Sequence, residues 1–494
     1  MNFREIVESL RLPGHGPLDV EVRDLTCDSR EAGPGSIFVA LKGEHSDGGD
    51  FIPKALGQGA VAILGDRWLP ELPPSLAFAR LDEPRTQMAT IARMVQGAPD
   101  ERLALLGVTG TNGKTTTTML IRQLLRGIGY GCGLIGTVML AAGGEEEEAT
   151  RTSPESPVFY RWIRRSADSG DRALAVEVSS HALSLARVHG ARFRVGLFTN
   201  LTQDHLDFHG DLESYFRAKV RLFEQCGKGL VNADDPFGQR LLAESPALLG
   251  FGMADAAAYR MAGLALSPTG TRFHLEAPQG GWEVESPLLG RFNAYNLLGA
   301  LAVCAEAGFD MDALVRAVPA LKGAPGRLDR VDCGQPFGVM VDYAHTPDAL
   351  EKLLVAGKDL LPPGGRLHVL FGCGGDRDRT KRAPMAAAVA RGADVIWHTS
   401  DNSRSEGMEQ ILDDAAAGIP EEVRSDPERY HCIRDRALAV EAALAACRPG
   451  DLLLLAGKGH EHYQEILGRK FPYSDRGAAE AVLAGGSVPR PWAE

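Results

Sequence analysis

The chain has 494 residues, of which 44% are apolar and 24% charged, and these values indicate a globular protein of about three domains. The formal charge of −12 argues against a surface that binds nucleic acid, since phosphate backbones are held by net basic patches. The eight cysteines are scattered without a CxxC pair or zinc-ligand spacing, so we expect reduced packing residues in a cytoplasmic protein.

The N-terminal segment MNFREIVESL has helical spacing and carries Arg4, Glu5 and Glu8, which is unlike a signal peptide. No uninterrupted apolar run approaches the ~20 residues that span a bilayer, so we expect no membrane insertion. The short apolar runs SIFVAL and AVAIL predict strands separated by turns. We therefore expect a first α/β domain over residues 1–99, which ends before the buried segment LALLG.

A second domain is expected over residues 100–330. Strands predicted at 103–108, 173–178, 195–198 and 230–232 alternate with helical segments, which indicates a mostly parallel sheet. The acidic run GGEEEE (143–148) is expected to be a solvated loop tip. Period-two alternation on both sides of Gly280-Gly281 predicts a β-hairpin.

The α/β pattern restarts near residue 331. FGVMVDYAH, RLHVLFG, ADVIWHTS and DLLLLAG are apolar runs separated by helical segments. A third, Rossmann-like α/β domain is therefore expected over residues 331–494. The predicted fold class is α/β with three domains.

The stretch LLGVTGTNGKTTTTML (105–120) is typical of a strand that turns into a helix around a phosphate. Lys114 adds a positive charge, and the Thr115 hydroxyl is suited to Mg²⁺. The usual phosphate-loop pattern has glycine five places before the Gly-Lys pair, where this chain has Val108. The motif alone leaves a kinase, a GTPase, an ATP-driven ligase and a non-catalytic nucleotide-binding module open.

The variant GTNGKTTT resembles the Mur ligase family, ATP-dependent amide-bond formers of cell-wall synthesis to which folylpolyglutamate synthetase is related. The resemblance covers the whole chain, because further motifs follow in the family's order: AVEVSSHAL, TNLTQDHLDFHG, AKVRLF, FNAYNLLGA, GAPGRLD, VDYAHTPD, FGCGGDRDRTKR and AGKGHE. It implies a central P-loop-type ATPase domain, an N-terminal UDP-binding domain and a C-terminal amino-acid-binding domain. The implied reaction adds the third peptide residue to UDP-N-acetylmuramoyl-L-alanyl-D-glutamate through an acyl phosphate. The implied cofactors are ATP and Mg²⁺, and we expect a monomer.

The resemblance also assigns the nucleotide and metal sites. The catalytic residues would be Lys114, Lys219, Glu177 and His205, and the metal ligands Thr115, Glu177, His205 and a modified Lys219. The expected ATP contacts are Gly110, Thr111, Asn112, Gly113, Lys114, Thr115, Thr116, Asn293, Asn296, Arg327 and Asp342. Read alone, Glu177 could be a helix-capping or paired acid and His205 a loop residue. With Asp204, Asp207 and His209 nearby, zinc is also conceivable, although oxygen-rich ATP sites favour Mg²⁺.

Lys219 lies in the helical stretch YFRAKVRLF, where periodicity alone predicts a solvated helix face. The resemblance implies instead that CO₂ carbamylates this lysine. That reaction would turn a cation into an anion directed toward Mg²⁺.

The segment CDSREAGPGSIFVALKGEHSDGGDFI (27–52) resembles the family's uridine-diphosphate region, although read alone it is a Ser-Arg turn and a Gly-rich loop. The implied contacts to the UDP-muramoyl dipeptide are Cys27, Ser29, Glu44, His45, Ser46, Thr152, Ser153, Ser179 and Arg187. Leu185 stands where related sequences can carry Gln.

The acceptor amino acid is indicated by HTSDNSRSEG (398–407), which follows a strand of the last domain. Family members that add meso-diaminopimelate carry Asp-Asn-Pro-Arg here, and lysine-adding members generally lack the Arg. This chain has Asp401, Asn402, Ser403 and Arg404, and the resemblance adds Arg377, Gly457 and Glu461. Because a guanidinium matches the second carboxylate that lysine lacks, we expect meso-diaminopimelate, with L-lysine or another diamino acid as the alternative.

Overall fold

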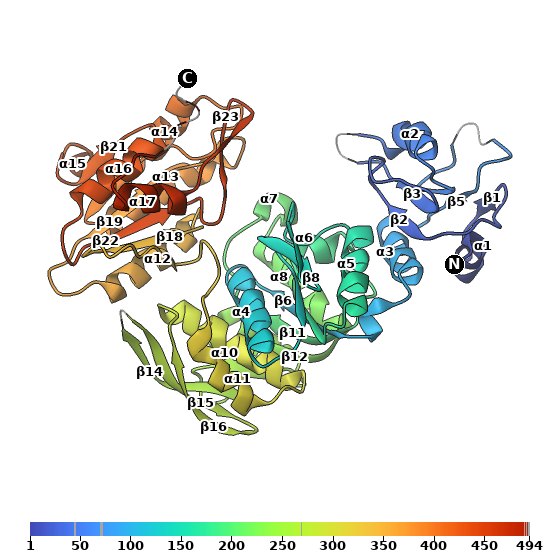
Figure 1. The fold of residues 1–494 in the computed structure, drawn as a ribbon, viewed down its shortest axis with the longest axis horizontal. Coiled ribbons are helices and arrows are strands. Elements are labelled where there is room, and N and C mark those ends of the chain that lie inside the picture. The colour runs from blue at the N-terminus through green and yellow to red at the C-terminus, as the bar shows by residue number, and fades with distance from the viewer. Residues whose placement is uncertain (44–45, 70–72, 268, 489, 491, 493–494) are drawn as a thin grey trace. The chain divides into compact units, whose positions relative to one another are not determined.

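The computed structural model describes residues 1–43, 46–69, 73–267, 269–488, 490 and 492. As the sequence predicts, it is an α/β protein with three sheet-containing domains (Figure 1). By compactness the chain divides into two units: unit 1 is Met1–Met261, Leu275–Gly281 and Asn296–Ala317, and unit 2 is Ala262–His274, Trp282–Tyr295 and Val318–Glu494. The expected domain limits 1–99, 100–330 and 331–494 stay predictions.

The N-terminal domain is built on a five-stranded sheet with the order β1-β5-β4-β3-β2. Strands β2 to β5 pair in parallel, and β1 pairs antiparallel with β5. All residues of β3 and β4 are buried, as expected for continuous apolar runs in a sheet covered on both faces. The elements are α1 (Phe3–Ser9), β1 (Gly14–His15), β2 (Asp24–Thr26), β3 (Ser36–Ala40), η1 (Gly48–Phe51), α2 (Ile52–Gly57), β4 (Ala62–Gly65), β5 (Phe78–Arg80), α3 (Pro84–Val95) and η2 (Pro99–Glu101).

The central sheet has the order β16-β15-β14-β13-β12-β11-β6-β10-β7-β8-β9. Strands β12, β11, β6, β10 and β7 pair in parallel, which confirms the predicted mostly parallel sheet. The predicted hairpin is confirmed by the neighbouring strands β15 and β16. The elements are β6 (Ala104–Thr109), α4 (Lys114–Gly127), β7 (Cys132–Ile135), β8 (Met139–Ala142), β9 (Glu145–Glu148), α5 (Ser156–Asp168), β10 (Ala173–Glu177), α6 (Ser180–Ser184), β11 (Phe193–Phe198), α7 (Leu206–His209), α8 (Leu212–Val220), η3 (Arg221–Gln225), β12 (Cys226–Asn232), α9 (Pro236–Glu244), β13 (Leu249–Gly252), β14 (Tyr259–Ser267), β15 (Gly270–Ala277), β16 (Gly280–Ser286), α10 (Arg291–Glu306), α11 (Met311–Ala317) and η4 (Val318–Ala320).

The acidic run 143–148 is not the loop tip that its composition predicts. Gly143 and Gly144 both have positive φ and form a turn, after which Glu145–Glu148 pairs antiparallel with β8 as the edge strand β9. All four glutamates are exposed, and Arg122 and Arg165 form ion pairs with three of them. Charged side chains on an edge strand discourage pairing with another sheet edge, so an acidic composition is compatible with a strand here.

The C-terminal domain contains a six-stranded sheet with the order β17-β18-β22-β19-β20-β21 and a two-stranded sheet, β23-β24. Strands β18 to β22 pair in parallel and β17 pairs antiparallel, as expected for a Rossmann-like domain. The elements are β17 (Asp329–Arg330), β18 (Gly338–Asp342), α12 (Pro347–Leu360), β19 (Leu367–Phe371), η5 (Arg379–Lys381), α13 (Arg382–Gly392), β20 (Val395–His398), α14 (Met408–Ala416), α15 (Glu421–Arg424), β21 (Tyr430–Cys432), α16 (Arg436–Ala446), β22 (Leu452–Ala456), β23 (Tyr463–Ile466), β24 (Arg469–Pro472) and α17 (Asp475–Leu483).

All eight cysteines are free thiols, but Cys27, Cys333 and Cys432 are exposed, so the expectation of packing residues is wrong for these three. Within the described ranges, no helix is long and apolar enough to cross a bilayer.

A buried ion pair joins two helices of the C-terminal domain. Arg436, at the start of α16, and Asp475, at the start of α17, both have fully buried side chains and meet at 2.6 Å. Arg436 also donates to the carbonyls of Ser400 and Ala456, and the Tyr473 hydroxyl donates to Asp475. The guanidinium therefore holds the ends of β20 and β22 in place.

Removing Asp475 leaves a buried guanidinium without its counter-charge. We expect Asp475→Ala to lower the free energy of unfolding by about 3–5 kcal/mol. The matched control is Glu351→Ala, which breaks the exposed pair with Arg391 and costs about 0.5 kcal/mol. Denaturant unfolding of both variants measures the difference, and equal small losses would contradict a structural role for the buried pair.

Candidate functional site

The candidate site of unit 1 lies where parallel strands of the central sheet end together. In the register of the sheet, Thr109 of β6 is opposite Phe198 of β11, and Val108 is opposite Glu177 of β10. The carboxyl ends of these strands therefore share one edge, which is where open α/β sheets place their ligands. The segments that follow β6, β7, β10 and β11 supply the side chains described next.

The phosphate loop consists of residues 110–113, between β6 and α4. Gly110 has φ 142° and Gly113 has φ 89°, conformations that favour glycine. A Cβ on Gly110 would overlap the Thr199 hydroxyl, and a Cβ on Gly113 would overlap the side-chain oxygen of Asn296. Both the backbone conformation and the neighbouring side chains thus require glycine at these two positions.

The segment after β11 fixes the shape of this loop. The amide of Thr111 donates to the Asn200 carbonyl at 2.9 Å, and the amide of Asn112 donates to Asn200 Oδ1 at 3.0 Å. The Thr199 hydroxyl donates to the Asn112 carbonyl at 2.6 Å. The loop is therefore held in shape by backbone and side-chain groups of residues almost ninety positions away in the sequence.

Two lysines converge on the loop. Lys114 Nζ donates to the carbonyls of Gly110 and Thr111, each at 2.9 Å, and Lys219 Nζ donates to the Gly110 carbonyl at 2.8 Å. Lys219 is 1% exposed, so the solvated helix face predicted from periodicity is wrong, because this face of α8 turns toward the phosphate loop. Burial, reinforced by the Lys114 charge, lowers the pKa of Lys219 well below its ordinary value.

Glu177 is the last residue of β10, and its carboxylate is buried. It accepts hydrogen bonds from the Thr115 hydroxyl at 2.9 Å, the Thr137 hydroxyl at 3.0 Å and the Thr137 amide at 2.7 Å. It caps no helix, so the alternative reading as a capping acid is wrong. Thr137 is not among the predicted site residues, although its place just after a neighbouring strand, β7, is a signal that could have identified it.

Three histidines cluster beside the loop. The His181 ring lies 4.9 Å from the His205 ring and 5.6 Å from the His209 ring, measured between centroids. Burial lowers the pKa of His181 to about 4, helped by the other two histidines, and burial also lowers the pKa of His205. His205 lies 3.4 Å from Asp204.

No group of three His, Cys, Asp or Glu side chains in the described ranges is arranged to hold a metal ion, so the structure gives the zinc alternative no support. Of the four expected metal ligands, Thr115 and Glu177 are in direct contact. The charges of Lys114 and Lys219 contribute to the lowered pKa of His205, and the charge of Lys114 contributes to the lowered pKa of Lys219.

The residues expected to contact the muramoyl peptide in unit 1 are brought together beside Glu177. The Thr137 hydroxyl lies 3.1 Å from that of Thr152. The Ser153 hydroxyl donates to the Glu177 carbonyl at 2.8 Å and lies 3.2 Å from the Ser179 hydroxyl. Arg187 donates to the Ser153 carbonyl at 3.1 Å and forms an ion pair with Glu155 at 2.9 Å. Leu185 is the C-cap residue of helix α6.

In the N-terminal domain, Cys27 and the buried Ser29 lie in the turn after β2, and Ser46 is exposed. Glu44 and His45 lie outside the described residues.

The two asparagines of FNAYN fall in different units. In unit 1, Asn296 is buried beside Gly113 and accepts from the Thr117 hydroxyl at 3.4 Å. In unit 2, Asn293 is buried and its amide nitrogen donates to the Leu289 carbonyl at 2.9 Å.

Unit 2 contains two more of the residues expected to contact ATP, Arg327 and Asp342. The Arg327 guanidinium lies over the Tyr343 ring, 4.7 Å from its centroid. Asp342 accepts from the amides of Leu328 and Ala344 at 2.7 and 2.8 Å, while burial raises the pKa of its carboxyl group.

The expected acceptor loop follows β20 in unit 2. Asp401, Asn402 and Ser403 are buried, as is Lys458. Lys458 Nζ donates to Asn402 Oδ1 at 3.0 Å, to Glu461 at 3.2 Å and to the Tyr463 carbonyl at 2.9 Å, and it lies 3.4 Å from Asp401. Sequence reasoning missed Lys458, although its place between two glycines directly after β22 is a usable signal.

The ionisable groups of this loop have shifted pKa values. Burial on its own raises the pKa of Asp401, but the charges of Lys458 and Arg436 hold it below its ordinary value. Burial raises the pKa of Glu461, opposed by Lys458.

Arg404 has the left-handed φ of 51° and donates to the Gly375 carbonyl at 2.6 Å. Arg377 is exposed. The pKa of Asp376 is lowered by hydrogen bonds from Ser405 and further by both arginines, which places the two guanidinium groups near one carboxylate.

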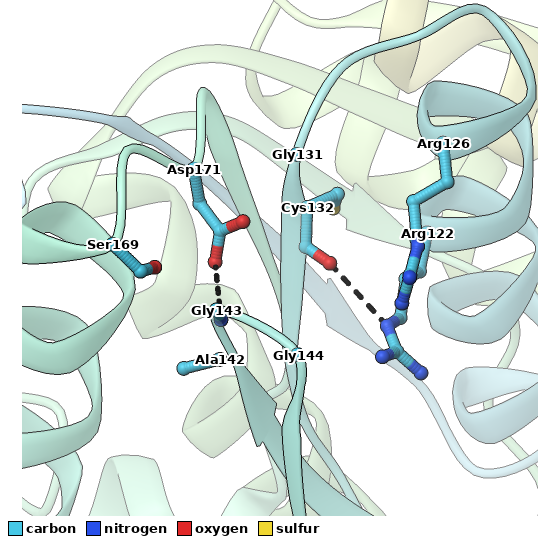
Figure 2. A pocket seen from close by; sticks show the side chains of 9 residues that line it. All are labelled: Arg122, Arg126, Gly131, Cys132, Ala142, Gly143, Gly144, Ser169 and Asp171. Carbon is cyan, nitrogen blue, oxygen red and sulfur yellow. Dashed lines mark hydrogen bonds between the residues drawn. The ribbon is translucent and has the colours of Figure 1, made fainter.

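A separate pocket of about 250 Å³ lies at the start of β7 (Figure 2). Arg122 and Arg126 line one side and Asp171 and Ser169 the other, with Cys132 between them. None of the predicted site residues lines this pocket, so it is distinct from the phosphate loop.

Three family models match this chain, and all three describe domains of Mur ligases. Residues 108–304 match a family model described as "Mur ligase middle domain", and residues 326–459 match one described as "Mur ligase, glutamate ligase domain". Residues 21–80 match a third model, "Mur ligase family, catalytic domain".

The chain is 42% identical to a protein of Solibacter usitatus and 41% identical to one of Thermosynechococcus vestitus, both named UDP-N-acetylmuramoyl-L-alanyl-D-glutamate--2,6-diaminopimelate ligase. These matches cover 98% of this chain and 99% and 98% of the two relatives. A solved structure of a ligase with the same name shares 33% identity and a TM-score of 0.68, over 98% of this chain and 99% of the other. With two relatives above 40% identity over nearly its whole length, the chain belongs to the Mur ligase family.

Proposed function

We propose that this protein is an ATP-dependent ligase that adds meso-2,6-diaminopimelate to the D-glutamate of UDP-N-acetylmuramoyl-L-alanyl-D-glutamate in peptidoglycan synthesis in the cytoplasm. The main support is the full-length similarity to ligases named for this reaction. The phosphate loop, the buried Glu177 and the Asp401–Arg404 loop are consistent with it.

The first step activates a carboxylate that does not condense with an amine in neutral water. An oxygen of the D-glutamate side-chain carboxylate attacks the γ-phosphorus of ATP, the acyl phosphate forms and ADP leaves. Negative charge develops on the phosphoryl oxygens, and Lys114 with the loop amides at the start of α4 supplies the stabilising positive charge. Thr152, Ser153, Ser179 and Arg187 would hold the peptide, since they converge beside the loop.

The residues next to the loop fit a magnesium ion. Thr115, Thr137 and Glu177 offer only oxygen atoms, and Mg²⁺ is typically bound by one or two carboxylates together with water and phosphate. Thr115 and Glu177 would hold the ion, with His205 on the same side. When bound, the ion neutralises charge on the phosphate oxygens.

Lys219 is suited to carbamylation because its amine is buried and its pKa is lowered. The neutral amine attacks CO₂, an N–C bond forms, one proton is released and an anionic carbamate results. The change converts the amine that meets Lys114 at the Gly110 carbonyl into an anion.

In the second step, the amine of diaminopimelate attacks the acyl carbon. The amide bond forms, phosphate leaves with the electron pair of the broken C–O bond, and the amine proton passes to solvent. Glu461 and Asp401 are suited to the ammonium group of the amino acid. Arg404 is suited to its distal carboxylate, since a guanidinium binds a carboxylate through two parallel hydrogen bonds.

The reaction itself is tested by its substrate requirement. We expect ADP release only when the UDP-muramoyl dipeptide and an amino acid are both present, and mass spectrometry of a panel of amino acids to show the diaminopimelate adduct. Lys114→Ala is the inactive control, with a loss on the order of 10²-fold or more. Turnover of GTP or ATP without either substrate would favour a kinase or GTPase instead.

Lys219→Ala should be nearly inactive and partly rescued by a small added carboxylate, because the proposed active group is the carbamate anion and not the amine. Steady-state rates with and without the carboxylate measure the rescue. Lys228→Ala, which removes an exposed lysine, is the matched control and should keep its activity without responding to the carboxylate. An unmodified Lys219 mass in a fully active preparation would refute the carbamate.

Arg404→Ala should raise the KM for diaminopimelate by roughly 30- to 1000-fold, equivalent to about 2–4 kcal/mol, because the distal carboxylate loses its charge-assisted contact. The KM values for ATP and the UDP-muramoyl dipeptide should change little. Initial-rate kinetics with each substrate varied in turn measure this, and Arg424→Ala, at an exposed position, is the control. Efficient addition of lysine by the unmodified protein would overturn the assignment of the acceptor.

A further inference from the structure

The pocket at the start of β7 lies wholly within unit 1 and is lined by charged groups of both signs (Figure 2). Its volume of about 250 Å³ is just below the roughly 300–1,000 Å³ of sites that bind drug-sized ligands, so its occupant would be a small metabolite. The pocket lies at the far end of α4 from the phosphate loop, because that loop precedes the first residue of α4 and Arg126 belongs to the last turn. The proposed ligase reaction uses none of the lining residues.

Two arginines form the cationic side of the pocket. Arg122 and Arg126 are four residues apart on α4, so they lie on the same face of this helix. Arg122 forms an ion pair with Glu146 at 2.7 Å, and its Nη1 atom contacts the Met139 thioether, a weak acceptor, at 3.6 Å. Arg126 is exposed and has no ion pair or side-chain hydrogen bond within the described ranges. One guanidinium of the pocket is therefore available to a ligand.

Asp171 forms the anionic side of the pocket. Its Oδ2 atom accepts from the Ser166 hydroxyl at 2.6 Å and from the Gly143 amide at 3.3 Å, which fixes the orientation of the carboxylate. Its Oδ1 atom lies against Gly131, where an added Cβ would be 2.6 Å from it. In the part of the chain that the structure describes, Asp171 forms no ion pair and Oδ1 accepts no hydrogen bond. Glycine at position 131 therefore leaves a carboxylate oxygen uncovered beside the pocket.

The charged groups of both sides surround Cys132. Burial raises the pKa of its thiol to about 12, with a contribution of the same sign from Asp171 and opposing contributions from Arg122 and Arg126. All three charges therefore act on one sulfur atom, which places them around the same cavity. The thiol stays protonated at pH 7, so the pocket is not a site for a cysteine nucleophile.

We propose that this pocket binds a small zwitterion, a free amino acid whose carboxylate pairs with Arg126 and whose ammonium group pairs with Asp171. A guanidinium binds a carboxylate through two parallel hydrogen bonds, and Arg122 Nη1 supplies a further donor on the same helix face. The uncovered Oδ1 atom of Asp171 is an acceptor suited to an ammonium group, which has three donors. A ligand with a single charge satisfies only one side, because the cation and the anion that line the pocket are not paired with each other.

Calorimetric titration of the full-length protein tests the binding with probes that differ in charge. The zwitterionic probes are glycine, 3-aminopropanoate and 4-aminobutanoate, which carry the two charged groups at increasing separation. Acetate and methylammonium each carry only one of the two charges. We expect one zwitterion or more to bind roughly tenfold or more tightly than either singly charged probe, because losing a charge-assisted contact typically costs at least that factor.

Arg126→Gln and Asp171→Asn each remove one charge and nearly keep the size of the side chain. Each should weaken the binding of the zwitterion roughly tenfold or more. The matched control is Arg165→Gln, at an exposed arginine of α5 that does not line the pocket, and it should bind the probe like the natural protein. Thermal unfolding of the variants checks that the fold is kept.

Binding that is unchanged in both pocket variants would come from another site, such as the loop 401–404 of unit 2, and would overturn the proposal. Acetate that binds as tightly as the zwitterion would show an anion site instead and would also overturn it. So would the absence of binding by every zwitterion at millimolar concentration. Because no substrate of the ligase reaction is present, these results do not depend on whether the proposed function holds.

Discussion

The site of unit 1 depends on the conformation of residues 110–113. This short connection between β6 and α4 exists only because glycine occupies both positions with positive φ, where a side chain would collide with Thr199 or Asn296. Hydrogen bonds from the segment after β11 then fix it. Since Lys114 and Lys219 both donate to its carbonyls, the loop also determines where the two Nζ atoms lie.

The same edge of the sheet explains why the other residues gather there. Glu177 ends β10, and Thr137 and Ser153 reach it from segments that lie far apart in the sequence. A buried carboxylate is stable only when its oxygens are hydrogen-bonded, and three protein donors meet this need. The residues expected to contact the peptide are thereby linked through Thr137 and Glu177 to Thr115 at the start of α4.

Unit 2 is organised by buried cations. Lys458 joins Asp401, Asn402 and Glu461, and Arg436 joins the ends of β20 and β22 to α17. A buried charge is tolerated only when it is paired and fully hydrogen-bonded, so the loops around these cations have little freedom. Little freedom in the loop 401–404 would suit the proposed discrimination between amino acids that differ by one carboxylate.

The sequence by itself determined the α/β class, the phosphate loop and the order of the family motifs, because strand and helix periodicity and glycine positions are local properties of the chain. It did not reveal that Lys219 is buried, that Glu145–Glu148 forms an edge strand, or that Thr137 and Lys458 belong to the sites. Burial and pairing depend on segments that fold against a residue from far along the chain. Only the tertiary structure therefore decided which charges are desolvated and which distant side chains meet Glu177 and Lys458.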